Sequence, residues 1–278
     1  MTEILNLTFK VSVLIFVIGS MLSMGLSLTM QQILEPLKNI RLVLFSLIAN
    51  FVLIPLLIFG IIAVVPLTEG EKIGLILLSL AAGAPFLPKL AGIARSNIAF
   101  SIGLMLLLMV VTIFYLPVVL PLVLKGAAVS SWAIARSLIT LMLIPLIAAL
   151  LVRAYFEKTA GKLVPLFTAI TNIALVVLTV VLIVLHYQSL LNMIGYGMLS
   201  VFLLLIGAMI IGYLLGGPGK DTRNVLALGT GQRNISAAIL VATQNFGDDP
   251  EVTLILVATA IFGLVIMLPV AARMGKRE

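Results

Sequence analysis

The chain has 278 residues, of which 62% are hydrophobic and only 10% are charged. A soluble domain has about 45–50% apolar and about 25% charged residues, so this composition predicts an integral membrane protein with little room for a water-soluble domain. The chain contains no cysteine, which excludes disulfides, thiolate catalysis and cysteine-based metal sites. Its net charge of +7 would suit a nucleic-acid-binding protein, so the positions of the charges decide that interpretation.

Nine apolar runs are long enough to cross a bilayer, which takes about 20 helical residues. They lie at about 9–28, 40–65, 72–95, 97–124, 131–155, 163–186, 192–215, 223–246 and 251–274. No basic segment precedes the first run and no A-x-A-like cleavage site follows it, so we predict a retained helix and no cleaved signal. The second and fourth spans exceed the minimum length, and Pro55, Pro117 and Pro121 predict kinks in them.

The basic residues indicate the orientation. With the N-terminus outside, the cytoplasmic side holds twelve Lys and Arg residues, whereas the outer side holds only Lys10, Lys72 and Lys125. The twelve are Lys38, Arg41, Lys89, Arg95, Arg153, Lys158, Lys162, Lys220, Arg223, Arg273, Lys276 and Arg277. Because cytoplasmic loops carry the excess of Lys and Arg, we predict a multi-pass protein of the plasma (inner) membrane with a cytoplasmic C-terminus. The basic residues then act as scattered topology determinants, which argues against a nucleic-acid partner.

The third span is interrupted in its second half by Gly83, Pro85 and Pro88. A proline has no N–H and clashes with the preceding turn, so we expect carbonyl groups near residues 81–84 to lack helical donors. Non-helical backbone at membrane depth occurs only where protein buries it or where it lines a cavity. This interruption therefore marks a candidate site.

The eighth span is interrupted in a similar way. Gly229 and Gly231 come just before Gln232, Arg233 and Asn234, near the middle of the apolar run. A charged residue at bilayer depth is costly and usually faces a cavity or a partner. We therefore expect a helix break at the two glycines and a functional arginine beside it.

The two interrupted spans are five apart, so equivalent helices would run in opposite directions. Interrupted helices at matching positions are typical of an inverted-topology repeat with its site at the midplane. We predict a single transmembrane unit over 1–278, with a first repeat of four spans at 1–127 and a second of five at 128–278. The sequence LIPL occurs at 53–56 and at 143–146, on spans that are not equivalent in this scheme. We interpret it as a recurring kinked-helix pattern.

Three segments together resemble the bile acid:sodium symporter family. They are MGLSLTMQQILEPLKNIRLVLFSLIANFVLIPLL at 24–57, IARSNIAFSIGL at 93–104 and GTGQRNISAAILVA at 229–242. The resemblance extends from end to end and includes the nine-span layout that some members have. It implies an all-α membrane protein with two crossing broken helices, a panel domain, a core domain and sodium-driven transport of organic anions.

The sequence departs from the family pattern at both sodium sites. The family's first broken helix carries Pro-Gly-Gly and then a sodium-binding Ser-Asn pair, but here Pro85 is followed by Phe-Leu-Pro. The second carries Glu-x-Gly-x-Gln-Asn, whose Glu and Gln bind sodium. Here Gly229 replaces the carboxylate and Arg233 replaces the Gln. Asn50, Ser101 and Asn234 still match the pattern.

These departures suggest that Arg233 replaces sodium electrostatically, because a fixed guanidinium is always charged and repels a bound cation. It would hold the carbonyls of the crossing together or pair with an anionic substrate. The alternative is a structural bridge to Asn50 or Gln232. Lys89 is either a second anion contact or a snorkelling side chain. The candidate substrate and ion site is Asn50, Lys89, Ser101, Gly229, Thr230, Gln232, Arg233 and Asn234.

We therefore predict a secondary active transporter of a small organic anion, such as a bile-acid-like or other carboxylate, that works by alternating access. The alternatives are a sodium-independent or proton-linked carrier of the auxin-efflux or arsenite-exporter type, and a non-transporting membrane sensor or scaffold. No Ser/His/Asp set, carboxylate pair or HExxH motif is present, so we expect no enzyme. We expect no cofactor either, and a sodium ion follows only from the resemblance.

Overall fold

The computed structural model describes residues 2–29, 31–32, 38–124, 130–247 and 249–276, and in these ranges every regular element is helical. The first half comprises α1 (Thr2–Ser27), α3 (Ile40–Ile48), η2 (Ala49–Leu53), α4 (Ile54–Val64), α5 (Glu69–Leu80), α6 (Leu87–Ile93) and α7 (Ile98–Val123). The second comprises α8 (Ser131–Leu138), η3 (Ile139–Leu143), α9 (Ile144–Tyr155), α10 (Glu157–Met193), α11 (Tyr196–Leu215), α12 (Lys220–Gly231), α13 (Ile235–Asn245) and α14 (Pro250–Met274). The all-α prediction is confirmed. Lys125, Arg277 and the expected repeat boundary at 127/128 lie outside the described residues.

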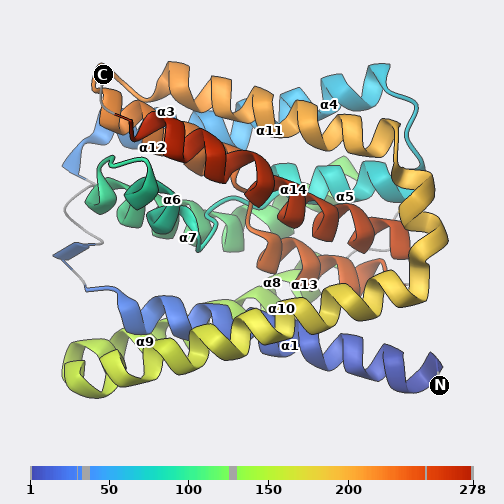
Figure 1. Cartoon of the computed structure of the whole chain (residues 1–278), viewed down its shortest axis with the longest axis horizontal. Helices are drawn as coiled ribbons and strands as arrows, with labels where there is room; N and C mark the ends of the chain where they lie inside the picture. The colour runs from blue at the N-terminus through green and yellow to red at the C-terminus, as the bar shows by residue number, and fades with distance from the viewer. Residues whose placement is uncertain (1, 30, 33–37, 125–129, 248, 277–278) are drawn as a thin grey trace.

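Eight helical segments in the described ranges are long and apolar enough to cross a membrane. The expected third span is not among them, because its helical residues divide into α5, of 12 residues, and α6, of 7 residues. The long helices lie roughly parallel, and successive connections alternate between the two ends of the molecule (Figure 1). The α6–α7, α9–α10 and α11–α12 turns and the C-terminus gather at one end, opposite the N-terminus. This arrangement is that of a multi-pass integral membrane protein.

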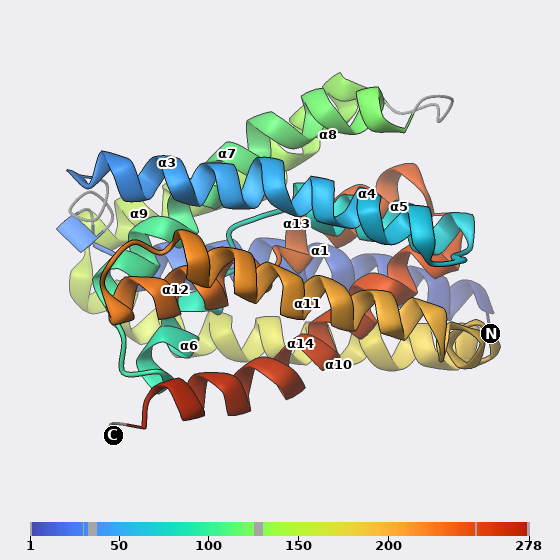
Figure 2. The same ribbon diagram turned by 90° about the horizontal axis from the view of Figure 1, so that it is seen from above.

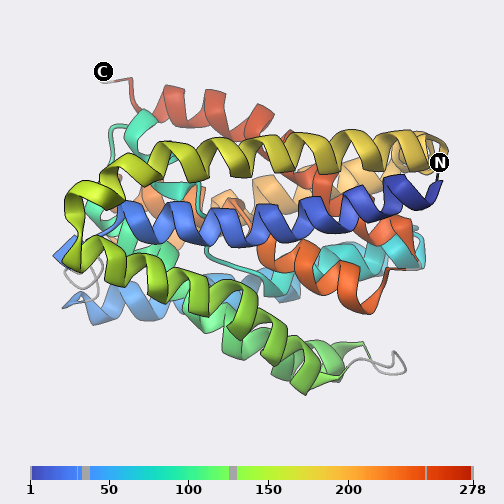
Figure 3. The same cartoon turned by 90° about the horizontal axis from the view of Figure 1, so that it is seen from below.

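The helices form three layers. α1, α9 and α10 pack side by side on one face, as Figure 3 shows from below. α3, α4 and α11 lie along the opposite face, seen from above in Figure 2. Between them lie α5, α12 and α13, most of whose residues are buried. A helix buried on every side has no face for lipid, so polar side chains in this middle layer must find partners within the protein.

Both copies of LIPL follow a π-helical turn. The N–H of Ile54 bonds to the carbonyl of Ala49, and that of Ile144 bonds to Ile139, so each turn contains one extra residue before the Ile-Pro pair. The proline ring clashes with the carbonyl four residues earlier, and the wider turn relieves this contact. Pro117 and Pro121 lie inside α7, which continues through both.

The first helix break lies between Leu80 and Leu87, where Gly83 and Pro85 are. Gly83 has a φ of +83°, and a Cβ there would lie 2.3 Å from the backbone nitrogen of Met109, so the break presses against α7. Pro88 does not interrupt a helix, because it lies in the first turn of α6. The prediction for Pro88 was wrong because the first turn of a helix needs no N–H donor and accepts the φ of proline.

The second break lies later than the two glycines suggest. α12 continues through Gly229 and ends at Gly231, and the non-helical residues are Gln232, Arg233 and Asn234. A Cβ on Gly229 would lie 2.8 Å from a methyl of Leu87, so this glycine gives room for close packing of α6 against α12. The expectation that Gly229 breaks the helix is corrected accordingly.

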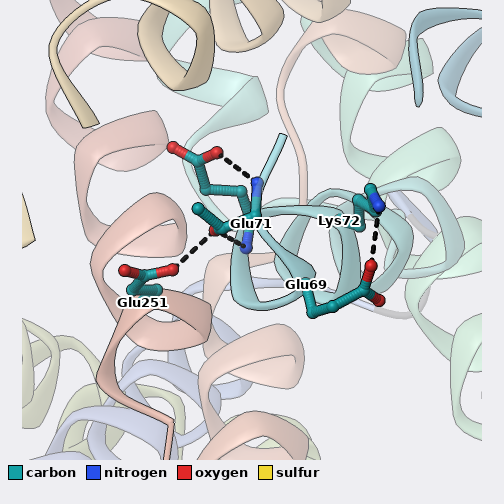
Figure 4. A network of polar contacts seen from close by, with 5 residues as sticks. Glu69, Glu71, Lys72 and Glu251 are labelled. Atoms are coloured by element: carbon teal, nitrogen blue, oxygen red, sulfur yellow. Dashed lines mark hydrogen bonds and ion pairs between the residues drawn. The ribbon is translucent and has the colours of Figure 1, made fainter. Parts of the chain in front are cut away.

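The N-termini of α5 and α14 are joined by a polar network (Figure 4). Thr68 and Glu71 form a capping box, in which each side chain accepts a hydrogen bond from the backbone N–H of the other residue. The Thr68 hydroxyl also donates to the carboxylate of Glu251 on α14. Lys72 pairs with Glu69 at 2.6 Å beside them. These contacts fix the N-terminal end of α5 against the N-terminal end of α14.

Candidate functional site

Arg233 lies in the second break, is 2% exposed and binds three other segments. Its Nε donates to the carbonyl of Leu78 and its Nη2 donates to that of Ser79, both at 2.8 Å. Its Nη1 donates to Asn50 Oδ1 at 2.8 Å and to the carbonyl of Thr230 at 3.3 Å. Four of the five guanidinium N–H groups therefore have partners, as a buried charge requires.

The acceptors of Arg233 explain the electrostatics of the site. Leu78 and Ser79 belong to the last turn of α5, and Thr230 belongs to the last turn of α12. The last carbonyls of a helix lack N–H partners, and the end that they form carries about half an elementary negative charge. Two such ends meet at one guanidinium. The cation thus neutralises both helix ends at a buried position.

Asn50 supports the arginine from η2. Its side chain is fully buried, its Oδ1 accepts from Arg233, and its Nδ2 donates to the carbonyl of Ser46 at 3.0 Å and to Thr230 Oγ1 at 3.3 Å. The π turn at this residue is typical of functional positions in helices. Arg233, Asn50 and Thr230 thus form one hydrogen-bonded cluster. The structure brings together three of the eight candidate residues in this way.

The two breaks also bind each other directly. The N–H of Asn234 donates to the carbonyl of Ala81 at 3.0 Å, and its Oδ1 caps α13 by accepting from the N–H of Ala237. On the other side, Thr112 of α7 accepts from the N–H of Ala82 and donates to its carbonyl. The carbonyls that the prolines were expected to leave free thus include those of Ala81 and Ala82. Both bind groups from other helices.

Two buried amide atoms in the second break have no hydrogen-bond partner among the described residues, namely Gln232 Oε1 and Asn234 Nδ2. One is an acceptor and the other a donor, and only Arg233 separates them in the chain. A buried polar atom without a partner costs about 1–3 kcal/mol. Each such atom calls for an explanation, and a partner supplied by a bound molecule or ion is one.

The remaining candidates lie outside this cluster. Ser101 is fully buried on α7, but its hydroxyl donates to the carbonyl of Ile98 at 2.6 Å within its own helix. Lys89 is exposed on α6, with its Nζ 5.0 Å from the ring centroid of Phe86. Gly229 contributes close packing against Leu87 and no polar group.

Sequence reasoning missed Tyr115 and the carbonyls of Leu78 and Ser79. The hydroxyl of Tyr115 donates to the carbonyl of Phe51 at 2.7 Å, and its ring packs against that of Phe51 at 4.8 Å. Phe51 lies four residues before Pro55, whose missing N–H would otherwise be its donor. Pro55 was the available signal for Tyr115, because it leaves the carbonyl of Phe51 without a helical donor. The helix end before Gly83 was the available signal for the carbonyls of Leu78 and Ser79.

A sodium site would need several oxygen ligands, and the family pattern supplies a carboxylate. In the described part of the chain no group of three His, Cys, Asp or Glu side chains could hold a metal ion. The carbonyls of Leu78 and Ser79 already bind a guanidinium, and Gly229 has no side chain that could supply a carboxylate. These residues do not fit a sodium ion at the position that Arg233 occupies.

Comparison with known proteins agrees with the architecture. Residues 13–193 match the family described as "Sodium Bile acid symporter family". The chain is 26% identical over 238 residues to "Uncharacterized sodium-dependent transporter YocS" of Bacillus subtilis, covering 81% of this chain and 72% of that protein. It is 27% identical over 240 residues to "Probable sodium/metabolite cotransporter BASS2, chloroplastic" of Oryza sativa, covering 81% of this chain and 55% of that protein. The chain belongs to the Sodium Bile acid symporter family, which consists of membrane transporters and not of enzymes.

Proposed function

We propose that this protein is a secondary active carrier of a small organic anion, in which Arg233 takes the place of the coupling sodium ion. The observation that carries the proposal is the position of the guanidinium, which donates to the carbonyls of Leu78, Ser79 and Thr230 and to Asn50 at the two helix breaks. A metal cation in such a place would be bound by the same oxygen atoms. The covalently attached cation makes that binding permanent.

The proposed topology has nine spans with the N-terminus outside, counting α5 and α6 together as the third span. The two breaks would be equivalent elements of an inverted repeat, because interrupted helices with opposed half-helix ends mark the midplane site of such carriers. The layer of α1, α9 and α10 would form the panel, and the remaining helices the core. Alternating access would be a rocking of one against the other.

The substrate would bind next to the breaks, where the panel meets the core. α1 contacts α13 there, and Ser20 and Ser236 lie 3.3 Å apart across this contact. The unpartnered Nδ2 of Asn234 is a donor that suits a carboxylate oxygen, and the unpartnered Oε1 of Gln232 suits a hydroxyl. A hydroxy acid or another polar carboxylate fits this pair better than a wholly apolar anion.

Uptake into proteoliposomes tests the proposal. Saturable uptake of a carboxylate from a panel, equal in sodium and in potassium buffers of the same ionic strength, is the expected result. Arg233→Gln should lose this uptake while it remains a folded, monodisperse protein. A steep dependence of the parent protein on sodium would refute the replacement of sodium by arginine.

The same experiment separates the alternatives. A non-transporting sensor or scaffold would show no saturable flux with any carboxylate. A proton-linked carrier would show uptake that responds to an imposed pH gradient in the absence of sodium. Thermal stabilisation by the same panel of carboxylates, measured in sodium and in potassium, identifies the substrate class before transport is attempted.

A further inference from the structure

The end of α14 that carries the C-terminus holds a basic pocket. Its volume is about 480 Å³, and it is lined by Pro269, Ala272, Arg273 and Lys276. Both charged side chains belong to exposed residues, and among the described residues no carboxylate forms an ion pair with either. Two cations, one from the last turn of α14 and one just after it, thus line one pocket at the end of the transmembrane bundle.

A third cation, Arg95, belongs to the turn after α6, and this turn packs against the end of α14. Arg95 follows the turn at Ile93 and Ala94, which packs against Gly275 so tightly that a Cβ on Gly275 would lie 2.5 Å from the carbonyl of Ile93. α6 and the end of α14 lie together near the C-terminus in Figure 2. Residues 94 and 275 are far apart in the sequence, so only the fold brings these two segments together.

The backbone of Arg95 indicates that its side chain has a use. It has a φ of +48°, the only positive φ of a non-glycine residue in the described ranges. The N–H of Ser96 bonds to the carbonyl of Ala91 and that of Arg95 bonds to Gly92, which is a Schellman motif with Arg95 at the position that normally holds glycine. Strained residues of this kind cluster at functional sites.

An apolar groove of about 280 Å³ lies along another face of the same end of α14. It runs between α11 and α14, and Ile210, Tyr213 and Leu214 line it from α11, opposite Val270 and Met274 of α14. Val270 follows Pro269 and Met274 follows Arg273, so the groove and the pocket are neighbouring faces of one helical stretch. An apolar surface and two cations are thus presented by the same end of α14.

Tyr213 places the groove at the depth of the membrane surface. Its ring stacks under the guanidinium of Arg223 at 5.6 Å, and Arg223 Nε donates to the carbonyl of Gly217 in the loop after α11. Tyrosine and arginine residues of this type are typical of the interface between lipid headgroups and acyl chains. The C-terminal end of α14 lies at the same end of the molecule as the α11–α12 turn (Figure 1), so the basic pocket is expected at the same membrane surface.

From these observations we propose that the protein binds an anionic phospholipid at this end. The lipid phosphate would lie between Arg273, Lys276 and Arg95, and one acyl chain would lie in the groove between α11 and α14. Basic pockets between transmembrane helices are a recognised form of headgroup site. A free anion would use the cations alone, whereas only a lipid uses the cations and the apolar groove together. Because α14 packs on α5, α6 and α13, the lipid would stabilise the middle layer.

The first test measures the thermal midpoint of the purified full chain in detergent during titration with phosphatidylglycerol. A saturable rise is expected with phosphatidylglycerol, and none with phosphatidylcholine or inorganic phosphate. The double variant Arg273→Gln/Lys276→Gln should need about thirtyfold more phosphatidylglycerol for half of the effect, the loss expected for two cations at a membrane surface. An equal rise with inorganic phosphate would refute a lipid site.

A matched control removes the same charge elsewhere. Lys158→Gln/Lys162→Gln alters two exposed lysines of α10 and should leave the titration unchanged. An equal loss in both double variants would show nonspecific attraction and overturn the proposal. Arg95→Gly relieves the positive φ, so it should raise the midpoint without lipid and weaken the response to phosphatidylglycerol. An unchanged response would remove Arg95 from the site.

Discussion

The Nε of Arg233 lies 2.8 Å from the carbonyl oxygen of Leu78, although 155 residues separate the two in the chain. The same guanidinium reaches Ser79 and Asn50 at equal distances, so one side chain joins α5, η2 and the end of α12. A buried cation is tolerated only when hydrogen bonds replace its hydration, and its acceptors come to depend on it in turn. The helix breaks and the arginine therefore form one unit.

Substitution of Arg233 or of a side chain that it binds should lower the free energy of unfolding. We expect Arg233→Met to destabilise the protein by about 3–5 kcal/mol, because it leaves several buried acceptors unpaired. Asn50→Leu should cost about 1–3 kcal/mol, because it removes an acceptor of the guanidinium. Since the two residues share a bond, the double variant should be less destabilised than the sum. Denaturant or thermal unfolding in detergent measures these effects.

The control for this series is Arg136→Met. Arg136 is exposed on α8, so the substitution should change stability by less than about 0.5 kcal/mol. If Arg136→Met lowers the stability as much as Arg233→Met does, the buried hydrogen bonds of Arg233 make no specific contribution to stability.

Restoring the family pattern should restore a response to sodium. In the double variant Gly229→Glu/Arg233→Gln, a carboxylate and an amide replace the glycine and the cation next to the carbonyls of Leu78 and Ser79. The three heavy atoms nearest to a Cβ at 229 are methyl carbons of Leu87 and Leu104, which belong to flexible side chains. We expect the thermal midpoint of this variant to be higher in sodium than in potassium, and that of the parent to be the same in both. Stabilisation of the parent by sodium would contradict the replacement.

The first break should tolerate no side chain at Gly83. Gly83→Ala combines a φ of +83° with a Cβ 2.3 Å from a backbone atom of α7, which cannot move aside as a side chain would. We expect loss of the folded protein on size-exclusion chromatography. Gly60→Ala is the matched substitution in α4, where a Cβ meets nothing within 4 Å, and a gain of up to about 1 kcal/mol is expected from helix propensity.

Tyr115 should contribute to stability because it supplies the hydrogen bond that Pro55 cannot donate to the carbonyl of Phe51. Tyr115→Phe keeps the ring contact with Phe51 and removes its hydrogen bond to the Phe51 carbonyl, at a cost of about 1 kcal/mol. In a Pro55→Ala background an amide N–H becomes available to that carbonyl, so the same substitution should cost less. A double-mutant cycle on unfolding free energies measures the difference. If Tyr115→Phe costs the same in both backgrounds, the hydrogen bond of Tyr115 does not compensate for the missing N–H of Pro55.

Local sequence signals predicted the long helices well. The fourth run, expected at 97–124, is α7 at Ile98–Val123, because 26 residues without a charge can only be buried in protein or lipid. Where the prediction failed, as at Pro88 and Gly229, the residue type allowed two structures. Proline suits both a break and a first helical turn, and glycine suits both a break and a close helix contact. Packing against α7 and α6 made the choice.

The sequence by itself determined that the chain is a helical membrane protein, where its apolar segments lie and that a cation is buried near one interruption, because hydrophobicity and the cost of burying a charge are local properties. The tertiary structure alone decided what that cation binds. Leu78 and Ser79 contribute backbone carbonyls, which every residue has, so no pattern of residue types distinguishes them. Their role arises only because two helices end at the same point in space, where the partial charges of both ends sum at Arg233.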